Sequence, residues 1–123
     1  MKKIIVTGGL GFIGSNLIEL LLKKKYQVIN IDKITYSSNF YNVKEFRNNK
    51  NYKFIKCDIS NKQKILKIFK KEKPLALFNL AAETHVYRSI DNPTTFINSN
   101  IVDVYWLLES FKNFTNYHKS KLI

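Results

Sequence analysis

Thr7-Gly8-Gly9-Leu10-Gly11-Phe12-Ile13-Gly14 is the stretch that decides the fold of this 123-residue chain, and it holds all four glycines of the sequence. An apolar stretch typical of a β-strand, Ile4-Ile5-Val6, precedes it, and a helical pattern begins at about Phe12. A strand, a glycine loop and a helix N-terminus in this order can hold the pyrophosphate of a dinucleotide. The backbone then approaches the phosphates closely, and the exposed N–H groups and the helix dipole offset their charge.

The glycine spacing, Gly8-x-x-Gly11-x-x-Gly14, differs from the commoner G-x-G-x-x-G, and a glycine triplet by itself is also compatible with a tight turn that binds nothing. A second strand is predicted at 27–31. It ends in Asp32, 18 residues after Gly14, where a carboxylate can accept hydrogen bonds from an adenosine ribose. Because strand, loop, helix and acidic residue all stand where the fingerprint needs them, the sequence predicts dinucleotide binding.

Strand and helix patterns alternate along the whole chain. Strands are expected at 2–6, 27–31, 52–57 and 75–80, and helices at 12–24, 43–48, from a cap at Ser60 to Lys73, and from Pro93 to Phe111. Right-handed crossovers place these strands in one parallel sheet of order 3-2-1-4. The predicted fold class is therefore α/β, a Rossmann-like doubly wound parallel sheet truncated after about four to five strands.

Ligands bind such sheets at the carboxyl ends of the strands, where the strand order reverses. The residues at those ends are Thr7 to Gly14, Asp32 to Thr35, Asp58-Ile59 and Leu80 to Thr84. Ala81 and Ala82 are small enough to let a cofactor approach the backbone after strand four. Asp58 has two interpretations: it serves as a turn or cap residue, or, together with Asp32, it accepts from an adenine amino group.

The composition bounds the choice of partners. Twenty-one Lys and Arg against nine Asp and Glu give a net charge of +12. Clustered cations favour nucleic acid, yet arginine occurs only at Arg47 and Arg88 and the lysines are spread over helix faces and loops. A solvated surface and no nucleic-acid partner are therefore predicted.

The single Cys57 excludes an internal disulfide and is expected to pack near a strand end rather than react. Without a membrane span, signal peptide or metal-ligand cluster, a cytoplasmic, metal-free domain with no membrane partner is expected.

The glycine run resembles the opening of the extended short-chain dehydrogenase/reductase family. Three further stretches are similar to its dTDP-glucose 4,6-dehydratase branch: Asp32-Lys33-Ile34-Thr35-Tyr36, Cys57-Asp58-Ile59 and the segment from Asn79 to Glu109. The resemblance covers essentially the whole chain. Thr84 replaces the usual Ser and keeps its hydroxyl, whereas Tyr87 stands where the branch usually carries Asp.

The resemblance implies NAD as cofactor and a nucleotide sugar such as dTDP-glucose as substrate, with oxidation at C4, loss of water across C5 and C6, and return of hydride to C6. The cofactor residues that it implies are Gly8, Gly11, Phe12, Ile13, Gly14, Asp32, Lys33, Ile34, Thr35, Asp58, Ile59, Leu80, Ala81, Ala82, Glu83, Thr84 and Ser99. Thr84 would also touch the substrate. His85 and Arg88 would either face the sugar nucleotide or have a structural role where the next helix starts.

The family's catalytic Tyr-x-x-x-Lys pair and Thr-Asp-Glu segment are expected beyond Ile123, so no catalytic residue is assigned within the chain. Residues 1–123 are interpreted as an NAD-binding Rossmann domain, an N-terminal fragment without the substrate domain. The alternatives are a stand-alone NAD-binding module and a fragment of a related nucleotide-sugar epimerase or decarboxylase. An exposed apolar edge along strand four, with Leu75, Leu77 and Phe78, predicts a homo-oligomer.

Overall fold

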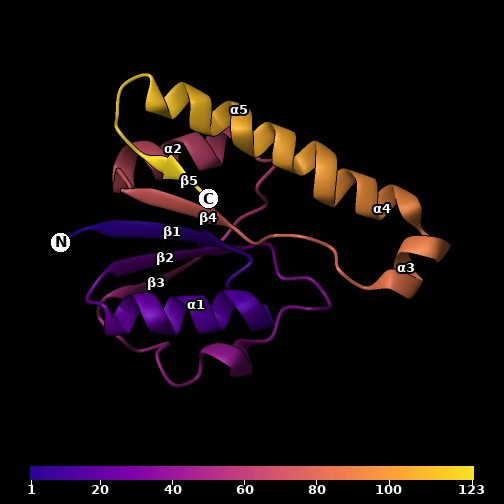
Figure 1. Cartoon of the computed structure of the whole chain (residues 1–123), viewed down its shortest axis with the longest axis horizontal. Helices are drawn as coiled ribbons and strands as arrows, with labels where there is room; N and C mark the ends of the chain where they lie inside the picture. Colours follow the sequence, from indigo (N-terminus) through magenta and orange to yellow (C-terminus); the bar gives the residue numbers. More distant parts are fainter.

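The computed structural model describes residues 1–123 as a five-stranded parallel sheet of order β3-β2-β1-β4-β5, with helices on both faces (Figure 1). The strands are β1 Lys3–Thr7, β2 Gln27–Asp32, β3 Tyr52–Lys56, β4 Ala76–Asn79 and β5 Lys121–Leu122. The helical elements are α1 Phe12–Lys23, η1 Phe40–Val43, α2 Lys62–Glu72, α3 Val86–Asp91, α4 Pro93–Ile97, η2 Asn98–Val102 and α5 Asp103–Thr115. The predicted fold class and the predicted order of the first four strands are confirmed.

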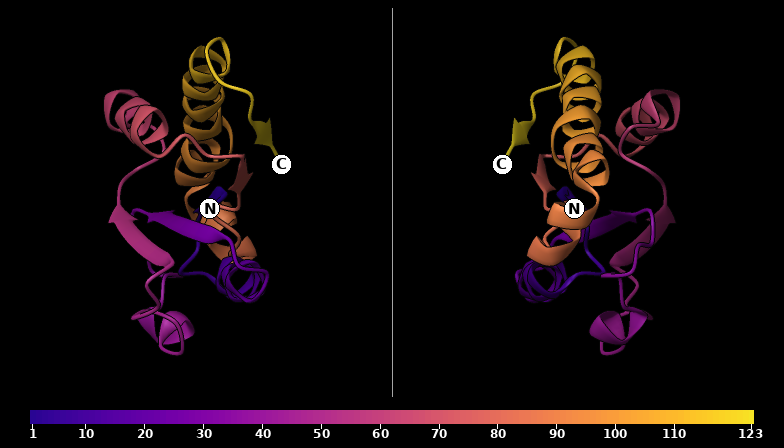
Figure 2. Two further views of the ribbon diagram at one scale, coloured as in Figure 1. Left: turned by 90° about the vertical axis from the view of Figure 1, so that its left-hand side faces the viewer. Right: turned by 90° about the vertical axis from the view of Figure 1, so that its right-hand side faces the viewer.

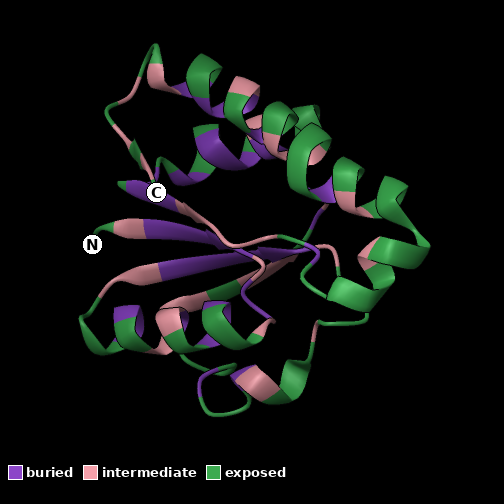
Figure 3. Cartoon of the chain, turned by 45° about the vertical axis from the view of Figure 1, so that its right-hand side comes forward, coloured by how far each residue is buried: buried purple, intermediate pink, exposed green.

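Two apolar cores lie on the two faces of the sheet, because successive side chains of a strand point to opposite sides. Ile4 and Val6 of β1 pack toward α1, whereas Ile5 packs toward α2 and α5. Figure 2 shows α2 and α5 together on one side of the sheet and α1 on the other. Buried residues are concentrated in the strands and on the inner helix faces, while α3 and α4 have none (Figure 3).

The N-cap of α2 lies one residue later than predicted. Asn61, not Ser60, is the N-cap, and its side-chain oxygen accepts a hydrogen bond from the Lys64 N–H at 3.1 Å. The Ser60 hydroxyl is occupied elsewhere, because it donates to Asp58 at 2.8 Å. The helix ends at Glu72, and Lys73 takes a left-handed conformation just before Pro74, which cannot continue a helix.

The long helix predicted from Pro93 starts there, but it is not uniform. A π-helical segment, η2, lies between α4 and α5, so the extra residue of a π-turn changes which side chains face the sheet. The separate short helix α3 was not predicted. The helix expected at 43–48 was misplaced: the structure has a 3-10 turn at Phe40–Val43, capped by the side chain of Asn39.

The expectation that strand four forms the edge of the sheet is wrong. The short strand β5 pairs with it in parallel, placing Leu122 next to Leu77, and Leu77 is fully buried. Phe78 is partly buried, and Leu75 alone stays exposed. The predicted homo-oligomer therefore loses its original argument and stays a prediction. No helix of the chain combines the length and the apolar character needed to cross a bilayer.

Candidate functional site

A cavity of about 680 Å³ opens at the carboxyl ends of β1, β2 and β4, beside the N-terminus of α1. Fifteen of the residues predicted to bind the cofactor line it: Gly8, Gly11, Phe12, Ile13, Gly14, Asp32, Lys33, Thr35, Ile59, Leu80, Ala81, Ala82, Glu83, Thr84 and Ser99. Two others, Ile34 and Asp58, line a neighbouring hollow instead. His85 and Arg88, for which either a contact with the sugar nucleotide or a structural role was expected, line neither space.

The glycines of the loop differ in how strictly the backbone around them excludes a side chain. Gly8 has a φ of +69°, and a Cβ there would lie 2.7 Å from the backbone carbon of Leu80. A Cβ on Gly14 would overlap the carbonyl oxygen of Gly8 and lie 2.8 Å from the Cα of Gly9. Gly11 is less constrained, since its Cβ would meet only the Gly8 oxygen at 3.3 Å. Gly11 is also the N-cap of α1, and no side chain caps that helix. The helix N-terminus thus faces the cavity with its dipole uncompensated.

Asp32 closes the β2 end of the cavity and is almost fully buried. Its carboxylate accepts hydrogen bonds from the N–H of Leu10 at 3.2 Å, the N–H of Ile34 at 2.7 Å and the hydroxyl of Ser38 at 2.9 Å. Ile34 has a φ of 63°, an uncommon conformation for a β-branched residue, and its bond to Asp32 helps to hold it there. The turn that presents the carboxylate is therefore fixed by the carboxylate itself.

The loop after β4 is fixed by two side chains from other elements. The hydroxyl of Thr7 donates to Asn79 at 2.6 Å and accepts from the N–H groups of Leu80 and Ala81. Asn100, on η2, forms hydrogen bonds with both backbone groups of Glu83. The Oε2 atom of Glu83 is buried in the cavity wall without a hydrogen-bond partner. A buried carboxylate oxygen without a partner is a natural acceptor for a donor that enters the cavity.

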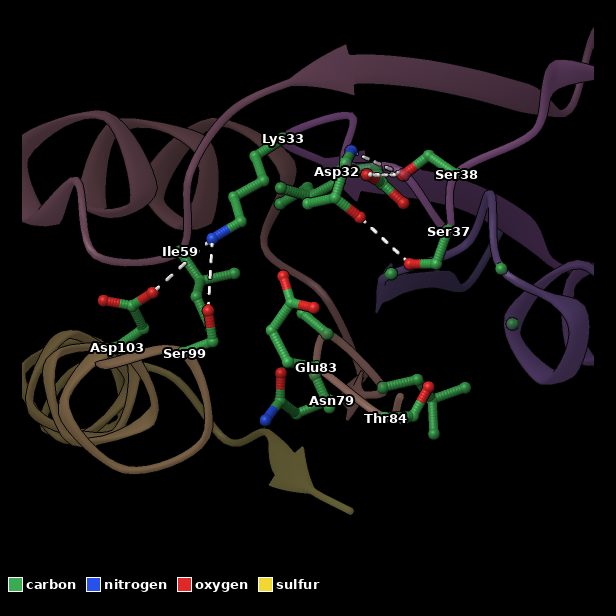
Figure 4. Close-up of a pocket in the computed structure, with 18 of the residues that line it drawn as sticks. Asp32, Lys33, Ser37, Ser38, Ile59, Asn79, Glu83, Thr84, Ser99 and Asp103 are labelled. Atoms are coloured by element: carbon green, nitrogen blue, oxygen red, sulfur yellow. Dashed lines mark hydrogen bonds and ion pairs between the residues drawn. The ribbon is translucent and has the colours of Figure 1, made fainter. Parts of the chain in front are cut away.

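Lys33 crosses from the end of β2 to the helices on the opposite wall (Figure 4). Its ammonium lies 3.4 Å from the Ser99 hydroxyl and 3.8 Å from Oδ2 of Asp103. Burial raises the pKa of Asp103; the negative charge of Asp58 raises it further, and the Lys33 ammonium opposes the rise. Ser99, one of the residues expected to bind the cofactor, thus contacts a side chain that follows β2.

Asp58 has the turn role that was one of its two interpretations. Its Oδ1 accepts from both the N–H and the hydroxyl of Ser60, at 2.9 and 2.8 Å. Its predicted contact with adenine is untested. Cys57, directly before it, lines the main cavity; it is buried, and burial raises the pKa of its thiol. This agrees with its expected packing role.

His85 and Arg88 make structural contacts beside the cavity. The Arg88 guanidinium lies 3.7 Å above the ring of Tyr36, and the ring of His85 meets the same ring edge-on at 6.3 Å. These contacts join the loop after β2 to α3. Desolvation and the nearby Glu83 carboxylate raise the pKa of Tyr36, whereas the Arg88 charge and the backbone of His85 partly offset the rise. Tyr87 is exposed.

Several cavity residues were not found from the sequence: Ile31, Ser37, Ser38, Cys57, Asn79, Asn100, Asp103 and Val104. Asn79 could have been found, because it ends strand four as Asp32 ends strand two. Asn100 lies in the π-helical segment and Asp103 directly follows it, and the sequence pattern did not predict this segment.

The cavity contains no tyrosine, and Lys33 is its one lysine. Two tyrosines carry a lysine four positions on, Tyr52 with Lys56 and Tyr117 with Lys121, but neither pair lies on a helix and neither lines the cavity. Burial raises the pKa of Tyr52, which is unfavourable for a base. No group of three or more His, Cys, Asp or Glu side chains is placed to hold a metal ion.

The chain is similar to known dehydratases over nearly its whole length. It is 48% identical over 115 residues to the dTDP-glucose 4,6-dehydratase of Haemophilus influenzae, covering 93% of this chain and 34% of that protein. It is 45% identical over 113 residues to an Escherichia coli protein of the same name, covering 91% of this chain and 31% of that one. The chain thus spans about a third of the length of these curated relatives.

Solved structures agree. The chain superposes on the dTDP-glucose 4,6-dehydratase of Bacillus anthracis, solved with NAD, with a TM-score of 0.84 and 35% identity, covering 99% of this chain and 36% of that one. The chain also superposes on the UDP-glucose 4-epimerase of Thermus thermophilus, solved with NAD, with a TM-score of 0.80 and 27% identity, covering 92% of this chain and 34% of that one. The sequence model of a family described as GDP-mannose 4,6 dehydratase matches residues 5–123. With its glycine loop, parallel sheet and cavity at the strand ends, the chain belongs to the GDP-mannose 4,6 dehydratase family.

Proposed function

We propose that residues 1–123 are an NAD-binding Rossmann domain, the cofactor-binding part of a nucleotide-sugar dehydratase that acts on dTDP-glucose or a similar sugar nucleotide. The observation that carries the proposal is the cavity at the carboxyl ends of β1, β2 and β4, which collects residues from five separate stretches of the sequence. This is where ligands bind in open α/β sheets.

The residues of the cavity fit NAD. A pyrophosphate would lie at the uncapped N-terminus of α1, where Gly11 leaves room for it and the N–H groups of Phe12 and Ile13 can donate. The Asp32 carboxylate would accept from the adenosine ribose. The unpartnered Oε2 of Glu83 and the small Ala81 and Ala82 would take the other end of the cofactor, with Thr84 reaching the substrate.

When bound, NAD would supply the hydride-transfer chemistry that oxidation at C4 and reduction at C6 of the sugar require. The residues of this chain contribute binding and orientation. Asp32 holds the ribose in register, the glycine loop neutralises the diphosphate, and Thr7 and Asn100 keep the loop after β4 in one conformation. Ile59 and Val104 contribute apolar surface to the cavity wall.

A second candidate is the cofactor-binding part of an NAD-dependent nucleotide-sugar epimerase, which the likeness to the Thermus thermophilus epimerase favours. The higher identity to the dehydratases supports the first proposal. Both share the same cofactor site.

Isothermal titration of the purified chain with NAD tests the proposal. Saturable binding with one site per chain is expected, and AMP is expected to compete for the adenosine end of the cavity. Heat that stays at the level of dilution at millimolar NAD would contradict the proposal.

A further inference from the structure

The ammonium of Lys33 is the positive charge next to Asp32 in sequence, and it is already engaged. Its Nζ is 3.4 Å from the hydroxyl of Ser99 and 3.8 Å from Oδ2 of Asp103. Both partners are shielded from solvent: Ser99 is buried, and the side chain of Asp103 is 15% exposed. In Figure 4 the lysine chain points away from the Asp32 carboxylate and toward these two residues.

The position of this charge matters because NAD and NADP differ only by a phosphate on the adenosine 2′-oxygen. A carboxylate at the end of the second strand accepts from the 2′-hydroxyl and repels a 2′-phosphate, whereas a nearby cation accommodates the phosphate. Asp32 is held in place by Leu10, Ile34 and Ser38 and cannot readily turn away. Whether a 2′-phosphate is tolerated therefore depends on a cation that can reach it.

Other cations near this end of the cavity are placed differently. Lys56 and Lys64 line the neighbouring hollow rather than the cavity. The ammonium of Lys64 donates to the carbonyl oxygen of Lys56 at 2.6 Å. Lys33 lines both spaces. It is thus the cation that a small side-chain movement would bring to the ribose.

We propose that Asp103 is a specificity-determining residue that acts through Lys33. By holding the Lys33 ammonium at the α5 wall, it denies that charge to a 2′-phosphate and so strengthens the preference for NAD over NADP. This inference rests on the proposed function. It goes beyond the carboxylate of Asp32, because it assigns part of the discrimination to a residue on a different element, 71 positions along the chain.

A double-mutant cycle tests the inference, with wild type, Asp103→Asn, Lys33→Met and the double variant. The measurement is the ratio of the dissociation constants of NADP and NAD, each obtained by calorimetry. This ratio is insensitive to a general loss of folded protein, because such a loss weakens both ligands. Asp103→Asn is expected to lower the ratio roughly tenfold, the effect of one freed ammonium–phosphate hydrogen bond. In the Lys33→Met background the same substitution is expected to change it less than about twofold.

Asp103→Ala removes the same carboxylate by a different side chain and is expected to give the same shift, which protects the test if Asn packs badly. An equal fall of the ratio in both Lys33 backgrounds would mean that Asp103 acts by long-range charge alone, and this overturns the inference. NAD binding with an unchanged ratio in both Asp103 variants overturns it as well, while leaving the proposed function standing. Absence of NAD binding by the wild-type chain would overturn both.

Discussion

Asn100 forms two hydrogen bonds with the backbone of Glu83: its Nδ2 donates to the Glu83 carbonyl at 2.9 Å, and its Oδ1 accepts from the Glu83 N–H at 2.8 Å. One side chain from η2 thereby fixes the loop that follows β4. The same loop carries the buried, unpartnered Oε2 of Glu83. The Glu83 carboxylate has a defined position for a ligand only if the backbone of Glu83 is fixed, and the two hydrogen bonds from Asn100 fix it.

Replacing Asn100 with Ala should therefore weaken NAD binding by about 1–2 kcal/mol, since two neutral hydrogen bonds that position the loop are lost. Calorimetric titration measures the effect. Asn98→Ala is the matched control, because Asn98 lies two residues earlier on η2, is exposed and makes no side-chain hydrogen bond. Equal affinities of the two variants would show that the restraint on Glu83 has no part in binding.

Substitutions of Gly11 and Gly14, at the start of α1, should have different effects on stability and on NAD binding. Gly14→Ala forces a Cβ into the backbone of Gly8 and Gly9 and should destabilise the domain by several kcal/mol. Gly11→Ala meets only one oxygen, at 3.3 Å, and should cost about 1 kcal/mol or less, yet its methyl group projects where the diphosphate would approach. Thermal melts and NAD titrations of both variants give the comparison. A Gly11→Ala chain that binds NAD as tightly as wild type would place the diphosphate elsewhere.

Replacing Asp32 with Ala should weaken NAD binding by about 1–3 kcal/mol, the range for hydrogen bonds to a charged group. Part of that loss reflects the turn, because Asp32 also accepts from Ile34 and Ser38. Ser38→Ala is the control: it removes one bond of the turn and leaves the carboxylate. The preference for NAD over NADP should persist in Ser38→Ala and disappear in Asp32→Ala. Tighter NADP than NAD binding by wild type would contradict the assignment.

Glu72 should make stability depend on pH. It is buried at the end of α2 and accepts from Lys53 and Lys3, each at 2.9 Å. These bonds, that from Lys53 foremost, lower its pKa against the opposing effect of burial. A lowered folded-state pKa means that the stabilisation is complete above the unfolded value of about 4.3 and is lost as the pH falls through the folded value.

Glu72→Gln should therefore reduce the free energy of unfolding by roughly 1 kcal/mol at pH 7, and the difference from wild type should shrink below about pH 4. Urea titrations across this range measure both quantities. Glu19→Gln is the control, because Glu19 pairs with Lys23 on the exposed side of α1, where such pairs contribute little. A difference that grows on acidification would mean that the pKa is shifted the other way.

The 123-residue chain by itself should not convert dTDP-glucose. Abstraction of the C4 hydroxyl proton needs a base within hydrogen-bond reach, and the cavity holds no tyrosine beside a lysine. Incubation with NAD and dTDP-glucose, with assay for the 4-keto-6-deoxy sugar, measures this. Product whose formation is abolished by a substitution in this chain would refute the expectation.

Much of the fold followed from local patterns. The apolar strands and the glycine run depend on residues close in sequence, so they could be identified and ordered. Caps and turns were harder to predict. Ser60 and Asn61 are both residues that favour an N-cap, but the Ser60 hydroxyl bonds to Asp58 and Asn61 caps α2. The propensities of single residues do not predict such a contact. Strand β5 is two residues long and is the fifth of the four to five strands that were predicted, but its pairing with strand four was not predicted.

The site could be predicted where it coincides with strand ends and not where it comes from helices. Asp32 ends β2, and Glu83 and Thr84 lie in the loop after β4, so the order of the sheet places them. Asn100 lies within the π-helical segment η2 and Asp103 directly follows it, and their partners Glu83 and Lys33 lie 17 and 70 residues away. Such pairings are set by the packing of whole elements, which the amino-acid pattern of one helix does not encode.

Cys57 gives the chain a chemical label at the cavity wall. It is the one thiol of the sequence, it is buried, and its raised pKa leaves little thiolate at neutral pH. Alkylation should therefore be slow, occur at a single atom and report directly on how often the wall opens. A molecule that fills the cavity should slow the reaction further, so mass spectrometry of the alkylated chain would measure occupancy in mixtures too dilute or impure for calorimetry.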